Sequence, residues 1–139
     1  MRLEWGREAL AVPAAMEMLG FDRDFGPCIT ACVLDRTNRV AAVLVFHNYA
    51  PEAGVIEVSA AAESAAWAQR GILREAFGYV FAHCQMAVAR CAESNTRVRR
   101  LWAAFGADEV VIPRLRGRDE AECILTLTDD AWRLSRFAR

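Results

Sequence analysis

The chain has 139 residues, of which 55% are hydrophobic and 25% charged, and its formal net charge at pH 7 is −1. This length is enough for one hydrophobic core and too small for two, so we expect a single domain over residues 1–139. The near-neutral charge argues against a dedicated nucleic-acid binder. Every basic residue is arginine, so catalysis through a lysine Schiff base is excluded.

Cysteine and histidine are spaced without a metal-binding pattern. The five cysteines lie in apolar stretches with no CxxC pair, and neither histidine stands at a zinc-ligand spacing from a cysteine pair. We therefore expect reduced, buried thiols and no metal site. The longest apolar run, residues 40–46, is far shorter than the ~20 residues that a membrane-spanning helix needs. These features predict a cytoplasmic protein that does not insert into a membrane.

The first half of the chain predicts one helix followed by three strands. Residues 7–19 have the spacing of an irregular amphipathic helix, in which Pro13 is tolerable only near the first turn or at a kink. Residues 29–35 and 40–47 are apolar and flank a short polar turn, which predicts a hairpin. Residues 55–59 predict a third strand, so the pattern up to this point is an antiparallel meander.

The apolar spacing then changes to that of a helix. Residues 73–81 carry an apolar stripe of the kind that faces a sheet. Residues 85–91 predict a strand, which a helical crossover places parallel to the strand at 55–59. The next helix is the best defined, because Asn95 is a natural N-cap and Gly106 a natural C-terminal stop.

The last part of the chain predicts two strands, residues 108–113 and 122–128, and a short terminal helix at residues 129–137. The fold class is therefore α+β, with a mixed, mostly antiparallel central sheet and helices on both faces. Where one parallel pair is embedded in such a sheet, the two strands can splay apart and expose backbone groups. The splay would form a slot for an extended ligand.

Two of the predicted helices begin with arginines, whereas helix N-termini prefer acids. Arg70 and Arg74 lie in the first turns of one helix, and Arg97, Arg99 and Arg100 in the first turns of the other. Each cation in a first turn is unfavourable by roughly 0.3 to 1 kcal/mol, so several together indicate an anionic partner such as phosphate. The alternative is a solvated arginine face whose side chains point away from the helix end.

The segment between residues 95 and 106 resembles a coenzyme-binding motif of the GNAT superfamily of N-acetyltransferases. The family commonly has an asparagine followed at fixed spacing by an apolar residue, a leucine, an aromatic residue and a glycine. Here these positions are in register, at Asn95, Val98, Leu101, Trp102 and Gly106. The resemblance covers about residues 29–128 and implies the GNAT fold with its splayed parallel strand pair.

A second family motif, Q/R-x-x-G-x-G/A, is less well kept. Gly71 matches its first glycine, but Ala68 stands at the Q/R position and Leu73 at the last position. Gly71 would let the backbone approach an anion closely or adopt a positive φ, and by itself it could equally be a helix-entry glycine. This loop, with Trp67 upstream, is similar to a branch of the family often found in phage and prophage genes.

The resemblance implies that acetyl-CoA binds along the splay and that its acetyl group passes directly to a primary amine. Backbone at Val58 and Ser59 would hold the thioester and the pantetheine arm, which Asn95 would also contact. The pyrophosphate would be held at the start of the helix after the splay by the amides of Gln69, Arg70, Gly71 and Ile72. Arg74 and Arg100 would add positive charge near the phosphates.

Glu57 is the candidate general base, because a carboxylate inside an apolar strand beside the splay is suited to take up a proton near neutral pH. The alternative is a sheet-face glutamate paired with an arginine. Trp102 stands where the family often has a tyrosine that acts as general acid, so water or another residue would serve. His47 and Tyr49 are expected in the loop before the Glu57 strand, on the acceptor side. Glu93 is a second carboxylate without an assigned role.

The sequence thus predicts an N-acetyltransferase that uses acetyl-CoA and a small-molecule or protein amine as acceptor. The alternative is a non-catalytic GNAT-like module that binds acyl-CoA or has a structural role, which Leu73, Trp102 and the missing acid favour. A nucleic-acid binder with an arginine patch is a third reading, which the net charge opposes. No motif identifies the acceptor, and the oligomeric state, a homodimer included, is left open.

Overall fold

The computed structural model describes residues Met1 to Arg139. Its centre is one seven-stranded sheet in the order β1-β2-β3-β4-β5-β7-β6. All neighbouring strands are antiparallel except β4 and β5, which are parallel. The strands are β1 (Arg2–Trp5), β2 (Cys28–Leu34), β3 (Val40–Ala50), β4 (Val55–Ala62), β5 (Met86–Ala92), β6 (Asp108–Ile112) and β7 (Glu122–Thr128).

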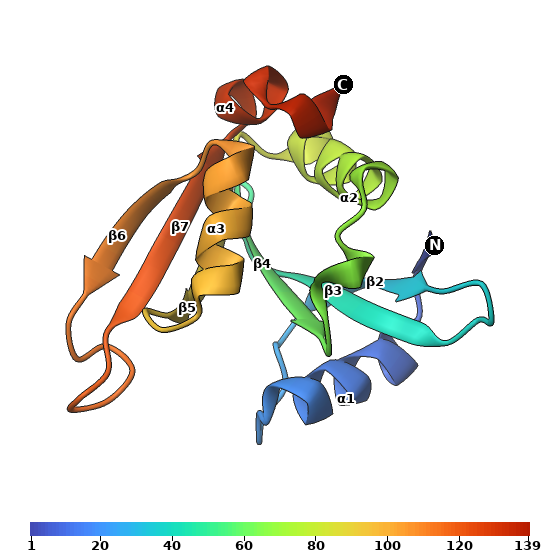
Figure 1. The fold of residues 1–139 in the computed structure, drawn as a ribbon, viewed down its shortest axis with the longest axis horizontal. Helices are drawn as coiled ribbons and strands as arrows, with labels where there is room; N and C mark the ends of the chain where they lie inside the picture. The colour runs from blue at the N-terminus through green and yellow to red at the C-terminus, as the bar shows by residue number, and fades with distance from the viewer.

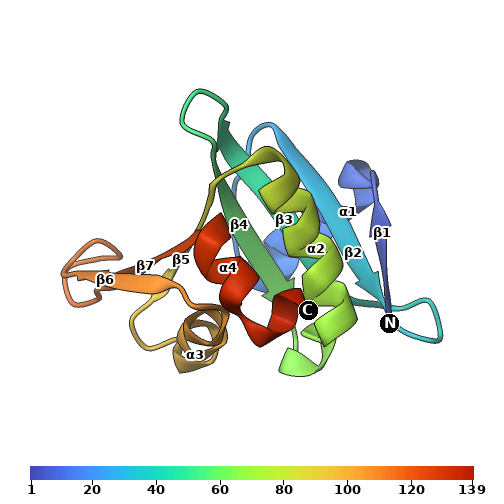
Figure 2. The ribbon, with the colours of Figure 1, turned by 90° about the horizontal axis from the view of Figure 1, so that it is seen from above.

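Helices lie on both faces of this sheet (Figure 1). In Figure 2, α2 and α4 lie in front of the sheet and α1 is seen behind it. The architecture confirms the predicted α+β class, including the parallel pair that the helical crossover joins. No helix combines the length and the apolar character that crossing a bilayer requires. The helices are α1 (Glu8–Leu19), α2 (Arg70–His83), α3 (Thr96–Phe105) and α4 (Asp129–Leu134), with short 3₁₀ helices η1 (Ala65–Trp67) and η2 (Arg136–Ala138).

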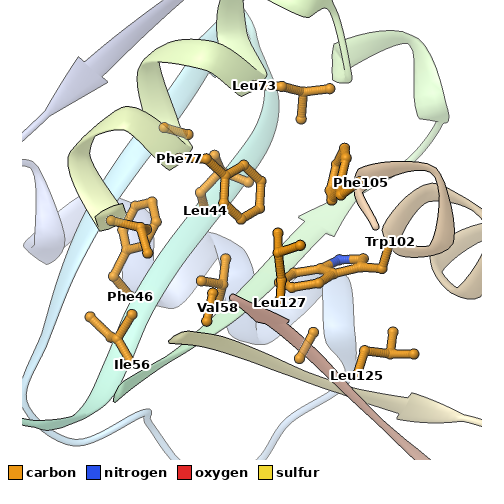
Figure 3. Close-up of a cluster of buried hydrophobic side chains, with 14 of the residues drawn as sticks. Leu44, Phe46, Ile56, Val58, Leu73, Phe77, Trp102, Phe105, Leu125 and Leu127 are labelled. Carbon is orange, nitrogen blue, oxygen red and sulfur yellow. The ribbon is translucent and has the colours of Figure 1, made fainter. Parts of the chain in front are cut away.

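The larger core fills the space between the sheet and the helices α2, α3 and α4. Figure 3 shows Phe77 from α2 and Trp102 and Phe105 from α3 gathered over the sheet residues Leu44 and Val58. The Phe77 ring lies 5.5 Å from the Trp102 ring and 5.1 Å from the Phe105 ring, centroid to centroid. A smaller cluster packs α1 against the opposite face of β2, β3 and β4. The two clusters thus pack against opposite faces of the central strands.

Two parts of the sequence-based prediction are wrong. The edge strand β1 was not predicted, because four residues are too few to show a period of two against the background. The loop expected around His47 and Tyr49 is strand instead, since β3 continues until Ala50 pairs with Val55 of β4. His47 is therefore a buried residue of the sheet.

Candidate functional site

The parallel pair of β4 and β5 is short and then opens. Its paired Cα positions end at Glu57 and Val88, although β4 continues to Ala62 and β5 to Ala92. Each strand stays paired on its other side, β4 with β3 and β5 with β7. The backbone of both strands beyond the last pair therefore faces an opening, and the predicted splay is confirmed.

A cavity of about 220 Å³ lies in this opening. Of the 21 residues that line it, 17 are hydrophobic, so its interior suits an apolar chain more than a charged group. The polar exceptions are Ser59, Arg90, Asn95 and Arg116. The hydrophobic wall comes from β3 and β4 (Leu44, Phe46, Val58, Ala60), β5 (Ala89, Cys91, Ala92), α2 and the turn before it (Trp67, Leu73, Ala76, Phe77), α3 (Val98, Leu101, Trp102, Phe105) and the end of α1 (Leu19, Phe21).

The start of α2 offers backbone donors that nothing in the protein uses. The N-cap residue Gln69 makes no side-chain capping bond, and its own N–H donates to the Trp67 carbonyl. The N–H groups of Arg70, Gly71 and Ile72 have no acceptor in the protein. Three of the four amides predicted to hold an anion are thus free, and they point outward from the positive end of a helix dipole.

Gly71 is helical and has no positive φ, so the left-handed backbone considered for this glycine is wrong. A Cβ added to Gly71 would meet no atom within 4 Å. The surface next to Gly71 in the first turn of α2 is therefore open. An anion seated there would receive the free N–H groups directly.

Two of the first-turn arginines, Arg99 and Arg70, have partners within the protein. Arg99 donates to the Glu109 carboxylate of β6 and, at 2.7 Å, to the Glu93 carbonyl. The same interaction lowers the pKa of Glu109. Arg70 donates to the Arg136 carbonyl. Arg99 therefore links α3 to β6.

The other first-turn arginines, Arg74, Arg97 and Arg100, are exposed and form no ion pair. Arg100 lies in a separate groove between α3 and β6, and not in the wall of the cavity. Asn95 does lie at the cavity, where its Oδ1 accepts a hydrogen bond of 3.3 Å from the Val98 N–H and caps α3 as predicted. Of the predicted site residues, Val58, Ser59 and Asn95 line the cavity, whereas Arg74 and Arg100 lie outside its wall.

Glu57 belongs to a polar network on the α1 face of the sheet. One carboxylate oxygen accepts a hydrogen bond of 3.1 Å from the Asn48 side chain, and the other lies 3.6 Å from Nε2 of His47. The same Nε2 is 2.8 Å from the Ser59 hydroxyl. Glu57 has no arginine partner, so the alternative of a glutamate–arginine pair is wrong. Ser59 lines the cavity, whereas Glu57 and His47 stand behind it.

Sequence reasoning missed a second polar group at the cavity. Glu122 of β7 is buried and accepts hydrogen bonds from Arg90 at 2.9 Å and Arg116 at 3.1 Å. Both arginines line the cavity. The three residues come from two strands and a loop, so no local sequence motif predicts that they meet. Glu93 lies outside, in an adjoining groove, and Tyr49 lies in a groove at the other end of α2.

No model of a known protein family matches the sequence, and no curated protein matches it. Solved structures match it in fold. A putative acetyltransferase from Acinetobacter baylyi has a TM-score of 0.74, 12% identity and 93% coverage of both chains. The spermidine/spermine N-acetyltransferase SpeG from Vibrio cholerae has a TM-score of 0.75, 11% identity and 91% coverage of both chains.

A GCN5-related N-acetyltransferase from Brucella melitensis is similar at 21% identity, with a TM-score of 0.62 over 76% of this chain and 52% of that chain. At such identities the likeness concerns the fold alone. This chain therefore has the fold of the GNAT N-acetyltransferases, as the motif at residues 95–106 implied.

Proposed function

We propose that this protein is an N-acetyltransferase that moves the acetyl group of acetyl-CoA to a primary amine. The observation that carries the proposal is the opening between β4 and β5, whose apolar cavity is lined by Trp67 and Leu73, the residues before and after the free N–H groups at the start of α2. An apolar slot next to an anion site matches the two ends of a nucleotide thioester.

The residues around the slot fit such a ligand. Backbone beyond the last strand pair, at Val58 and Ser59, has no partner strand on the β5 side and would bind the pantetheine amides. Asn95 at the cavity would contact the same arm. The free amides of Arg70, Gly71 and Ile72 would bind the pyrophosphate. When bound, the thioester would supply an activated acetyl group at the splay.

Three other predicted residues would contribute less directly. The Gln69 N–H is already bonded to Trp67, which leaves only its side chain for a ligand. Arg74 and Arg100 are exposed and unpaired, so they would attract phosphates over a longer range and in a salt-dependent way. We propose Glu57 as part of the group that removes a proton from the amine, since it lies where the strands diverge.

A second candidate is a non-catalytic module with the same ligand. Two observations favour it. Leu73, which replaces the small residue at the end of the loop motif, is fully buried in the cavity wall and narrows the slot. Trp102 occupies the position of the family's acidic tyrosine and is also buried there. Neither residue supplies a proton to a leaving thiolate.

The two candidates are separated by binding and turnover measured on the same protein. Isothermal titration with acetyl-CoA is expected to show one site per chain, and no heat at millimolar ligand would exclude both candidates. Release of free thiol in the presence of amines then tests transfer. The amine panel includes polyamines, because a spermidine/spermine acetyltransferase shares the fold, together with amino acids and peptide N-termini. Binding without thiol release under any amine supports the non-catalytic module.

A further inference from the structure

The Glu57 side chain does not line the cavity, so it cannot take a proton directly from an amine bound there. Among the polar residues that line the cavity, Ser59 is the one that connects to Glu57. Its hydroxyl oxygen lies 2.8 Å from Nε2 of His47, and that nitrogen lies 3.6 Å from the Glu57 carboxylate. A continuous polar path thus leads from the cavity through Ser59 to a buried imidazole and its acidic neighbour.

His47 sits at the centre of this path and is only 6% exposed. It is packed by the Phe25 ring, with ring centroids 5.1 Å apart, and faces Glu57 on β4 and Cys28 on β2 across the sheet. Burial lowers the pKa of His47, and the Glu57 charge opposes this shift. The imidazole is therefore neutral at pH 7, with a lone pair free to accept a proton.

The remaining titratable groups near His47 do not compete for this role. Burial and the charges of Glu8 and Asp24 raise the pKa of the Cys28 thiol, which keeps it neutral. Asp24 lies in the loop beside Phe25, and its carboxylate accepts the Gly26 N–H at 3.0 Å. Glu57 is the one carboxylate within 4 Å of the imidazole, so it is the group that responds to a charge on it.

The backbone is irregular at this network. The register of β3 and β4 shifts between His47 and Ala50, and Asn48 has a φ of 51°, in the left-handed region that most residues other than glycine avoid. From this position the Asn48 side chain donates to Glu57 and holds the carboxylate beside the imidazole. Strand irregularities and left-handed residues of this kind concentrate where a side chain must be aimed.

We propose that His47 accepts the proton of the acceptor amine through the hydroxyl of Ser59, and that Glu57 stabilises the imidazolium so formed. This inference rests on the proposed acetyl transfer and names its proton acceptor. Only Ser59 would contact the amine. His47 acts through Ser59 and Glu57 acts through His47, so both are positioning residues. The assignment moves the role predicted for Glu57 to its neighbour on β3.

The ammonium form of the substrate gives one proton to Ser59 Oγ as the Ser59 hydroxyl proton passes to Nε2 of His47. The neutral amine attacks the thioester carbonyl carbon, a C–N bond forms, the C–S bond breaks, and the amine nitrogen gives a second proton to the leaving thiolate. His47 returns its proton to solvent. The products are the acetylated amine, the free thiol and one released proton.

The kinetic test compares His47→Gln, Ser59→Ala and Glu57→Gln with the exposed control Glu52→Gln, whose residue lies in the turn after β3. His47→Gln is expected to lower kcat/KM by about 100-fold or more and to remove the acid limb of its pH profile. Ser59→Ala is expected to lose a similar factor, and Ser59→Thr, which keeps the hydroxyl, to restore it. Glu57→Gln is expected to lower kcat/KM by a smaller factor than His47→Gln does and to move the acid limb to lower pH, because the imidazolium loses its partner.

A second readout does not depend on turnover. The chain has two histidines, so the imidazole signals in an NMR titration belong to His47 or to the exposed His83 at the end of α2. In the Glu57→Gln variant the titration of His47 is expected to move to lower pH. An unchanged His47 titration would overturn the coupling to Glu57, and with it the proposal.

The outcomes separate this proposal from the proposed function. If His47→Gln binds acetyl-CoA and keeps the wild-type rate and acid limb, the relay is wrong and acetyl transfer stands. If Glu57→Gln abolishes activity while His47→Gln does not, Glu57 is itself the base and the relay is wrong. If the wild-type protein binds no acetyl-CoA, both the function and the relay are excluded.

Discussion

Glu57 of β4 and Val88 of β5 are the last paired residues of the parallel strands, and the next residues along each strand, Val58 and Ala89, lie in the wall of one cavity. The two halves of the sheet are joined there by three residue pairs. Beyond these pairs, β4 stays hydrogen-bonded to β3 and β5 to β7, so the two strands diverge with the two halves of the sheet. The opening is therefore a consequence of sheet topology and needs no ligand to create it.

A substitution at Gly71 is expected to change the affinity for acetyl-CoA without lowering the stability of the fold. Its conformation is helical and its surroundings are open, so Gly71→Leu is expected to fold with equal or higher stability, because glycine inside a helix costs about 1 kcal/mol relative to a good helix former. The added side chain occupies the space in front of the free N–H groups. The affinity for acetyl-CoA in isothermal titration is expected to fall at least about tenfold, which corresponds to the loss of one charged hydrogen bond.

Gly78→Leu is the matched control for this experiment. Gly78 lies in the same helix, and a Cβ there also meets no atom within 4 Å. It is two turns away from the N-terminus, so its substitution is expected to leave the affinity unchanged. Equal losses at both positions would mean that the anion site is not at the start of α2.

Local signals made much of this site predictable from sequence. The cap of α3 is an example, since Asn95 bonds the Val98 N–H and Gly106 ends the helix with a φ of 101°. Non-local pairing was not predictable. Nothing near β6 indicates that β7 inserts between it and β5, and Arg99 shows no sign of its partner Glu109 until the strands are placed.

The His47 network was hidden for a related reason. Pro51 and Gly54 mark a turn, but the strand before it extends three residues further than the apolar pattern suggests. Once β3 reaches Ala50, His47 lies opposite Glu57 by the ordinary pairing of the hairpin. The phage-type branch, a cytoplasmic location and a homodimer stay predictions, because a single fold does not decide them.

His47 also makes stability depend on pH. Its folded pKa lies below the ordinary value of 6.5, so the unfolded chain takes up the proton first as the pH falls. The free energy of unfolding is therefore expected to decrease as the pH falls from 6.5 through the folded pKa, and the contribution is fully present above 6.5. Urea unfolding of the wild type and of His47→Gln across this range measures it. If the free energy of unfolding depended on pH in the same way in the wild type and in His47→Gln, the burial of a neutral imidazole would be contradicted.

The aromatic cluster under α2 and α3 carries a large part of the core. Phe105 is 1% exposed, and its ring lies 5.1 Å from that of Phe77 and 5.5 Å from that of Trp132. Phe105→Ala is expected to lower the free energy of unfolding by about 3 to 5 kcal/mol in a urea titration. Leu134→Ala is the control, because Leu134 is 80% exposed and its loss is expected to cost less than about 0.5 kcal/mol.

The cysteines are expected to be slow to react. Cys91 and Cys123 face each other on β5 and β7, and burial together with Cys123 raises the pKa of the Cys91 thiol to about 11. Since the thiolate is the reactive form, iodoacetamide at about pH 8 is expected to spare both in the native protein and to reach the less buried Cys28 first. Mass spectrometry of native and denatured samples checks this. Fast labelling of Cys91 in the native state would mean that the splay admits water and reagent freely.

Substitutions of Trp102 test whether a side chain on α3 protonates the leaving thiolate. The indole is 6% exposed and lies in the cavity wall, where its ring packs against Phe105 at 5.8 Å between centroids. Because an indole N–H does not ionise near neutral pH, Trp102→Phe is expected to lower stability by about 1 to 3 kcal/mol without a matching loss of kcat. Trp102→Tyr places a phenol at the same wall and is expected to raise kcat and to add an alkaline limb to its pH profile. A loss of about 100-fold in kcat for Trp102→Phe, with coenzyme affinity unchanged, would instead give the indole a direct part in the reaction.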